Sequence, residues 1–186
     1  MVYVYKDYVI KEKIVIKVDT KNDLRYVLKV PLKNKTNKKI LVIMKNPSKA
    51  DREESDHTIN NVLKFCYSEG FSTVYIMNLY SFYSTKPKGI AALINNNQES
   101  LAIGKDNDRY LKKILQIVNE VIVAWGGNTF GCTERYKSRI EQVTRIIKGK
   151  NLYYVESKSE CNWYPRHAQV WSVNSNINMN NWIPPF

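Results

Sequence analysis

Apolar and polar positions alternate along the first part of the chain. Residues 2–18 and 24–31 are rich in Val, Ile and Tyr with a near two-residue period, which is typical of half-buried strands. The polar residues 19–23 between them are typical of a turn. Residues 1–32 are therefore predicted to form an antiparallel β-hairpin, followed by a basic connection over 33–39.

From residue 40 onward, short continuous apolar runs alternate with stretches of helical periodicity. The apolar runs predict buried strands at residues 40–44, 73–77, 121–124 and 152–155. Apolar residues at three- to four-residue spacing predict helices near 56–69, 89–94, 107–118 and 134–147. Because such alternation is typical of a parallel sheet covered on both faces, the predicted fold class is α/β. We expect a three-layer αβα core with a central four-stranded, mainly parallel sheet, preceded by the N-terminal hairpin.

The chain is expected to form a single domain. Its 186 residues are an ordinary length for one hydrophobic core, and no repeat or long linker divides them. Residues 39–173 hold the strand–helix core, and residues 174–186 form a polar tail. The Asn-rich residues 175–181 are predicted to be poorly ordered unless Trp182 and Phe186 pack against the core.

The charge balance points to a polyanionic partner. Lys and Arg number 29 against 17 Asp and Glu, which gives a net charge of +12. Neutralising phosphates with such side chains releases counterions and favours binding to nucleic acid. The alternative is a basic surface that serves solubility.

Other features of the composition exclude several classes of protein. The three cysteines are widely spaced and only two histidines occur, which argues against a disulfide framework and a zinc or iron–sulfur site. We therefore expect neither a metal nor a cofactor. No apolar stretch is long enough for a membrane span, and the N-terminus lacks the apolar block of a signal peptide, so a cytoplasmic protein is expected.

Four short motifs follow the four predicted core strands. They read Lys45-Asn46-Pro47-Ser48, Asn78-Leu79-Tyr80, Trp125-Gly126-Gly127 and Tyr164-Pro165-Arg166-His167. Since ligands of open parallel sheets bind beyond the carboxyl ends of the strands, we expect these motifs to meet at one edge. Each alone has an ordinary interpretation: Asn46-Pro47 as a turn, Trp125 as a core residue and His167 as a surface histidine.

In this order the motifs resemble those of the uracil-DNA glycosylase superfamily. The segments IMKNPS, YIMNLY, VIVAWGG and YPRHAQVWS carry the resemblance, which covers residues 40–172 and leaves out residues 1–31. The same signatures resemble, more closely, a widespread family of uncharacterised bacterial domains with N-P-S, N-L, A-W-G and R-H motifs. That second resemblance implies no function.

The glycosylase resemblance implies a monofunctional DNA-repair hydrolase that flips uracil out of DNA and hydrolyses its N-glycosidic bond. Asn46 matches the residue that orients the attacking water, and His167 the one that donates a hydrogen bond to uracil O2. Asn78 matches the residue that reads the O4 and N3–H edge of the base. Neither step needs a metal or a cofactor.

The resemblance also implies contacts that surround this catalytic pair. The substrate-binding set comprises Asn78, Pro47 and Ser48, with Tyr80 and Phe82 as candidates for stacking on the base. The DNA-binding set comprises Lys45, Lys49 and Arg166 on phosphates, with Ser48 assisting them, and Trp171 as a wedge that fills the gap left by the flipped base.

Three positions depart from the superfamily's patterns. Ser48 stands where the most selective family has a Tyr that blocks the thymine methyl, which leaves selectivity open. Asn46 in place of Asp predicts slower chemistry, and Ala168 in place of Pro predicts a looser fourth motif.

Two other interpretations stay open beside a monomeric enzyme acting on single- or double-stranded uracil-containing DNA. One is a non-catalytic module on the same fold that binds single-stranded or damaged DNA, with a replication partner or a protein inhibitor as its further ligand. The other is a hydrolase of free nucleosides, which leaves the +12 charge without a purpose. His57 is interpreted as structural or phosphate-facing. The first motif is followed by an acidic run of Asp51, Glu53, Glu54 and Asp56. This run is interpreted either as a solvated loop or, if the Asn46 assignment fails, as the source of a catalytic carboxylate.

Overall fold

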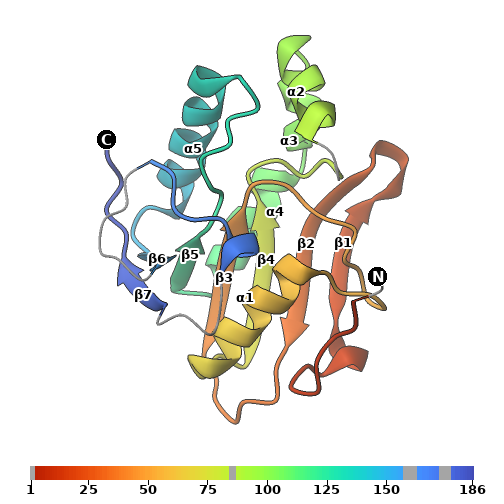
Figure 1. Cartoon of the computed structure of the whole chain (residues 1–186), viewed down its shortest axis with the longest axis vertical. Coiled ribbons are helices and arrows are strands. Elements are labelled where there is room, and N and C mark those ends of the chain that lie inside the picture. The colour runs from red at the N-terminus through yellow and green to blue at the C-terminus, as the bar shows by residue number, and fades with distance from the viewer. Residues whose placement is uncertain (1–2, 84–86, 157–162, 172–176) are drawn as a thin grey trace.

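The computed structural model describes residues 3–83, 87–156, 163–171 and 177–186, and the strands of this part form one seven-stranded sheet (Figure 1). The strand order is β1-β2-β4-β3-β5-β6-β7. The strands are β1 (Val15–Asp19), β2 (Leu24–Pro31), β3 (Lys39–Met44), β4 (Thr73–Asn78), β5 (Glu120–Val123), β6 (Asn151–Glu156) and β7 (Asn178–Asn181). The four central strands β4, β3, β5 and β6 pair in parallel, as predicted.

Helices cover both faces of this sheet, which confirms the predicted three-layer α/β fold. The helices are α1 (His57–Ser68), α2 (Pro87–Asn95), α3 (Glu99–Ile103), α4 (Asn107–Leu115) and α5 (Thr133–Ile147), with 3-10 turns η1 (Lys11–Lys13), η2 (Thr20–Asn22) and η3 (Ala168–Val170). Alternate residues of β3 point to opposite faces: Val42 joins the core under α1, whereas Ile43 joins the core under α4 and α5. A strand buried on both faces has to be apolar throughout, and this explains its sequence.

The N-terminal hairpin extends the core sheet. Strands β1 and β2 pair antiparallel, and β2 pairs antiparallel with β4, with Leu28 opposite Ile76. The first strand predicted over 2–18 is too long, because only β1 is regular there. The preceding residues form η1 and the isolated bridges Tyr3–Ser55 and Val9–Leu32. Their apolar alternation reflects packing of Tyr5 and Tyr8 against the core rather than strand pairing.

The C-terminal tail closes the opposite edge of the sheet. Strand β7 pairs antiparallel with β6, so residues 178–181 are ordered, which is the outcome expected if Trp182 and Phe186 pack against the core; residues 175–176 lie outside the described residues. Trp182 is 3% exposed and packs edge-on against Trp125, with ring centroids 5.3 Å apart. Phe186 stacks on Trp163. The two aromatic residues named as the condition for an ordered tail therefore both dock.

The connections place a topological switch point between β3 and β5. From β3 the chain crosses to β4 on one side of it through α1, on one face of the sheet. From β4 it crosses back to β5 on the other side of β3 through α4, on the opposite face. The two crossovers diverge at the carboxyl ends of β3 and β5, where open α/β sheets bind their ligands.

The described part of the chain was also searched for membrane-spanning helices, metal sites and disulfides. None of its helices combines the length and apolarity that crossing a membrane requires. Within the same residues, no group of three or more His, Cys, Asp or Glu side chains is arranged to hold a metal ion. Cys66 and Cys132 are free thiols, and Cys161 lies outside the described residues.

Candidate functional site

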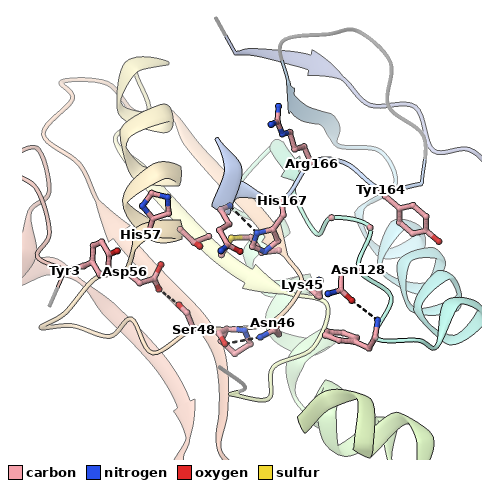
Figure 2. A pocket seen from close by; sticks show the side chains of 17 residues that line it. Tyr3, Lys45, Asn46, Ser48, Asp56, His57, Asn128, Tyr164, Arg166 and His167 are labelled. Carbon is pink, nitrogen blue, oxygen red and sulfur yellow. Dashed lines mark hydrogen bonds between the residues drawn. The ribbon is translucent and has the colours of Figure 1, made fainter. Parts of the chain in front are cut away.

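A cavity of about 670 Å³ opens at the switch point, beyond the carboxyl ends of β3 and β5 (Figure 2). Its walls come from the loop after β3, the start of α1, the loop after β5 and the segment before η3. The residues that line it are Tyr3, Met44, Lys45, Asn46, Pro47, Ser48, Asp56, His57, Thr58, Gly126, Gly127, Asn128, Phe130, Tyr164, Arg166, His167 and Gln169. Three of the four sequence motifs thus meet in one place, as the strand-end rule predicts.

The imidazole of His167 is held neutral and in one tautomer. Its Nδ1 accepts a hydrogen bond from the backbone N–H of Gln169 at 3.1 Å, so the ring proton of the neutral form resides on Nε2. Burial and, to a smaller extent, the nearby positive charge of Lys45 lower the pKa of His167 to about 4, although the charge of Asp56 opposes the shift. At neutral pH the cavity is therefore lined by an uncharged N–H donor.

Two glycines allow the segment that carries His167 to approach the end of β5. Gly126 has a positive φ of 71°, and a Cβ built on it would lie 2.9 Å from the Cβ of His167. A Cβ on Gly127 would lie 3.3 Å from the Cβ of Tyr164. The N–H of Gly126 donates to the carbonyl of Pro165 at 2.9 Å. The Trp-Gly-Gly motif is therefore a packing site for the fourth motif.

Trp125 is fully buried, in agreement with its interpretation as a core residue. Its indole N–H donates to the carbonyl of Trp163 at 3.0 Å, which ties the end of β5 to the segment before Tyr164.

Lys45 places a buried amine in the wall of the cavity. The side chain is 9% exposed, and its Nζ lies 4.9 Å from the ring centroid of Phe130. Burial lowers the pKa of Lys45 to about 8. None of the ion pairs between described residues includes it. The amine of Lys45 therefore lies over an aromatic ring and not beside a carboxylate.

Of the acidic run, the structure brings Asp56 to the cavity. One carboxylate oxygen caps α1 by accepting the N–H of Ile59 at 2.8 Å, and the other accepts a hydrogen bond from the Ser48 hydroxyl. Glu53 pairs instead with Lys11 on the surface. A negative charge therefore stands beside the motif that contains Asn46.

Arg25 binds the loop after β3, which forms one wall of the cavity, and this residue was not identified from the sequence. This fully buried side chain on β2 donates to the carbonyl of Ala50 at 2.7 Å and to that of Ser48 at 3.4 Å. It thereby holds the loop that follows β3. The signal in the sequence was an Arg between Leu24 and Tyr26 at the start of a mostly apolar strand, where a charged residue has to be bonded if it faces the core.

The structure brings together six of the residues assigned by the resemblance: Lys45, Asn46, Pro47, Ser48, Arg166 and His167 all line the cavity. Arg166 lies at the rim, 4.0 Å from the carboxylate of Glu156 (Figure 2). Lys49 is exposed on the same loop but is not part of the lining.

Asn78 does not reach the cavity, contrary to its assigned role in reading the base. It is the last residue of β4, pairs in register with Met44, and is 3% exposed. Its register partner Met44 lines the cavity, whereas Asn78 is not part of the lining. Among the described residues neither polar atom of its amide has a hydrogen-bond partner.

The three aromatic residues assigned by the resemblance do not line the cavity either. Tyr80 is fully buried in the core under α4 and α5 and donates its hydroxyl proton to Glu99 at 3.1 Å, and Phe82 packs against the same core. Trp171 is 2% exposed and packs edge-on against Phe65 of α1 at 5.5 Å. An indole buried in the core cannot act as a wedge in DNA.

The fold and the cavity define an α/β protein with a ligand-sized site at its switch point. The sequence matches the family described as proteins of unknown function (DUF1643) over residues 25–167. The chain belongs to this family, and the match spans every motif at the cavity. Searches of curated proteins and of solved structures found no match to the chain.

Proposed function

We propose that this protein is a DNA glycosylase that excises uracil by hydrolysing the N-glycosidic bond. One observation carries the proposal. Asn46 and His167, which the resemblance assigns to water and to the leaving base, come from distant parts of the chain and line the same cavity. The cavity lies where such sheets bind ligands, and its size suits a nucleoside.

The chemistry of the lining suits the charges that develop in this reaction. As the bond breaks, the base gains negative charge and the sugar gains positive charge. The Nε2–H of neutral His167 can donate to the base oxygen without surrendering a proton, because the tautomer is fixed by Gln169. Asp56 and Asn46 both line the cavity, where the carboxylate would lie near the sugar and the amide would orient the water.

The corrected placements change which residues recognise the base. Asn128 is a carboxamide that lines the cavity, and it replaces Asn78 as the candidate for reading the base edge. Phe130 and Tyr164 are aromatic residues of the lining and replace Tyr80 and Phe82 as candidates for stacking. The basic surface and Arg166 at the rim would hold the phosphates.

The test is cleavage of a labelled single-stranded oligonucleotide that contains one deoxyuridine, with alkali to break abasic sites. Oligonucleotides with thymine or hypoxanthine at the same position serve as controls for the base. We expect strand breaks at uracil, and a loss of about 10²–10³-fold in rate for His167→Ala, which removes one donor to the leaving base. The control is Asn151→Ala, an exposed residue at the amino end of β6 that is not part of the cavity lining, and this variant should cleave like the wild type.

The second candidate is a non-catalytic DNA-binding module on the same fold. Two observations favour it: the net charge of +12 suits a polyanionic partner, and Asn78, assigned to reading the base, is buried and does not line the cavity. This candidate predicts no product at stoichiometric protein together with binding whose affinity falls steeply with salt.

A further inference from the structure

We propose that Lys45 is a second reactive group of the cavity, whose amine forms an imine with the aldehyde carbon of an abasic deoxyribose in DNA. The protein would then cut the DNA strand at abasic sites as well as create them. The inference rests on the proposed function for its substrate, since an abasic site is the product of base excision.

The position of Lys45 carries the argument. It directly precedes Asn46, so an abasic sugar left where Asn46 orients the water would lie next to the amine. Among the described residues, Lys45 is the only buried lysine. Its amine is accompanied by the ring of Phe130, at 4.9 Å, and not by a carboxylate at ion-pair distance. A phosphate-binding lysine, by contrast, is ordinarily exposed and fully charged.

The surroundings of the amine favour its neutral, nucleophilic form. With the pKa of Lys45 lowered to about 8, roughly a quarter of the amine is neutral at pH 7.5, against about one in a thousand for an ordinary lysine. The other ionisable groups of the lining are Tyr3, Asp56, His57, Tyr164, Arg166 and His167.

The proposed steps balance without an oxidant or a reductant. The lone pair of the neutral amine adds to the aldehyde carbon of the ring-opened sugar. The carbonyl oxygen takes up one proton from the amine and one from solvent and leaves as water, which gives an imine that keeps one N–H and carries a positive charge. That cation acidifies the C2′–H bond. Loss of this proton to water forms a carbon–carbon double bond as the C3′–O bond breaks, and the 3′ phosphate departs with the downstream strand. Water then hydrolyses the imine and restores Lys45.

The test uses the full chain and an oligonucleotide with a preformed abasic site, so it does not depend on uracil excision. Sodium borohydride reduces an imine to a stable amine and would crosslink protein to DNA. We expect a crosslinked product for the wild type, with the modified peptide containing Lys45, and at least a hundredfold less product for Lys45→Arg, which keeps the charge. The control Lys64→Arg, on the exposed side of α1, should crosslink like the wild type.

Circular dichroism and thermal unfolding of each variant establish that it is folded. Absence of a crosslink in the folded wild type, or a crosslink that persists in folded Lys45→Arg, would overturn the inference. The outcome is separable from the proposed function: a protein that excises uracil without crosslinking loses only the role of Lys45. A protein that crosslinks to abasic DNA but leaves uracil in place retains that role and loses the glycosylase proposal.

Discussion

Replacing Gly126 by Ala tests the close contact between the end of β5 and the segment that carries His167. Two costs add at this position. A side chain at the positive φ of 71° costs about 1–2 kcal/mol. The new Cβ would lie 2.9 Å from the Cβ of His167, and forcing a methyl group into such a packed site costs about 1–3 kcal/mol more. The free energy of unfolding should therefore fall by about 2–5 kcal/mol.

Gly131→Ala is the matched control for this substitution. Gly131 has a similar positive φ of 78°, but a Cβ built on it would meet nothing within 4 Å. The control should lose only the backbone cost of about 1–2 kcal/mol. The difference between the two variants then isolates the contact with His167.

Urea unfolding of the wild type and both variants measures these differences. The midpoints should shift without a change in the dependence of the unfolding free energy on urea, because the folded and unfolded states keep their compactness. If Gly126→Ala loses no more stability than Gly131→Ala, the segment that carries His167 does not pack on Gly126 as described, and the cavity loses one of its walls.

Three further predictions concern residues in and beneath the cavity. Trp171→Ala should lower the free energy of unfolding by about 3–5 kcal/mol because it empties a core site; a change below about 1 kcal/mol in thermal unfolding would contradict the burial. Lys45→Met should raise the stability at pH 7 by about 1–3 kcal/mol, since it removes a buried charge without a carboxylate partner. That gain should be largest below about pH 8 and vanish toward pH 10.5. A lower free energy of unfolding for the variant than for the wild type in urea at pH 7 would contradict this prediction. His167 has a folded pKa near 4, below the usual 6.5. Its contribution to the free energy of unfolding should therefore be fully present above pH 6.5 and should be lost as the pH falls toward 4. His167→Gln should flatten this part of the pH profile, and an unchanged slope would show that the imidazole is not held neutral.

The core of the fold was predictable because its signals are local. Continuous apolar runs mark the central strands. Helix α1 is marked by Asp56, which caps its start, and by Gly70, which follows its end with a positive φ. The edges were less accessible. Strand β7 reads Asn-Met-Asn-Asn and has no apolar pattern, and it forms because the edge of β6 offers unpaired backbone groups and Trp182 finds a place in the core.

The location of the candidate site was predictable from the sequence, but not all of the residues that form it were. The rule that ligands bind at carboxyl ends of strands gathered Asn46 and His167 from sequence alone. Asn78 belongs to β4, which runs one residue further than its apolar run, and so it is buried in the strand instead of lining the cavity. Trp171 was misplaced because burial of a large apolar ring in the core outweighed the position that the resemblance assigned. Arg25 acts through backbone carbonyls of a loop, which no sequence motif encodes.

The central claim is that the cavity at the ends of β3 and β5 hydrolyses an N-glycosidic bond to uracil. The most direct measurement is the single-turnover rate of uracil release from a deoxyuridine oligonucleotide, compared between the wild type and Asn46→Asp. A carboxylate at this position can take up the proton of the attacking water, which an amide cannot, so the variant is expected to be faster by about tenfold or more. Release of uracil by the wild type and faster release by Asn46→Asp is the predicted result. No uracil from either protein at stoichiometric concentration, with DNA binding retained, would contradict the claim and identify the chain as a DNA-binding module.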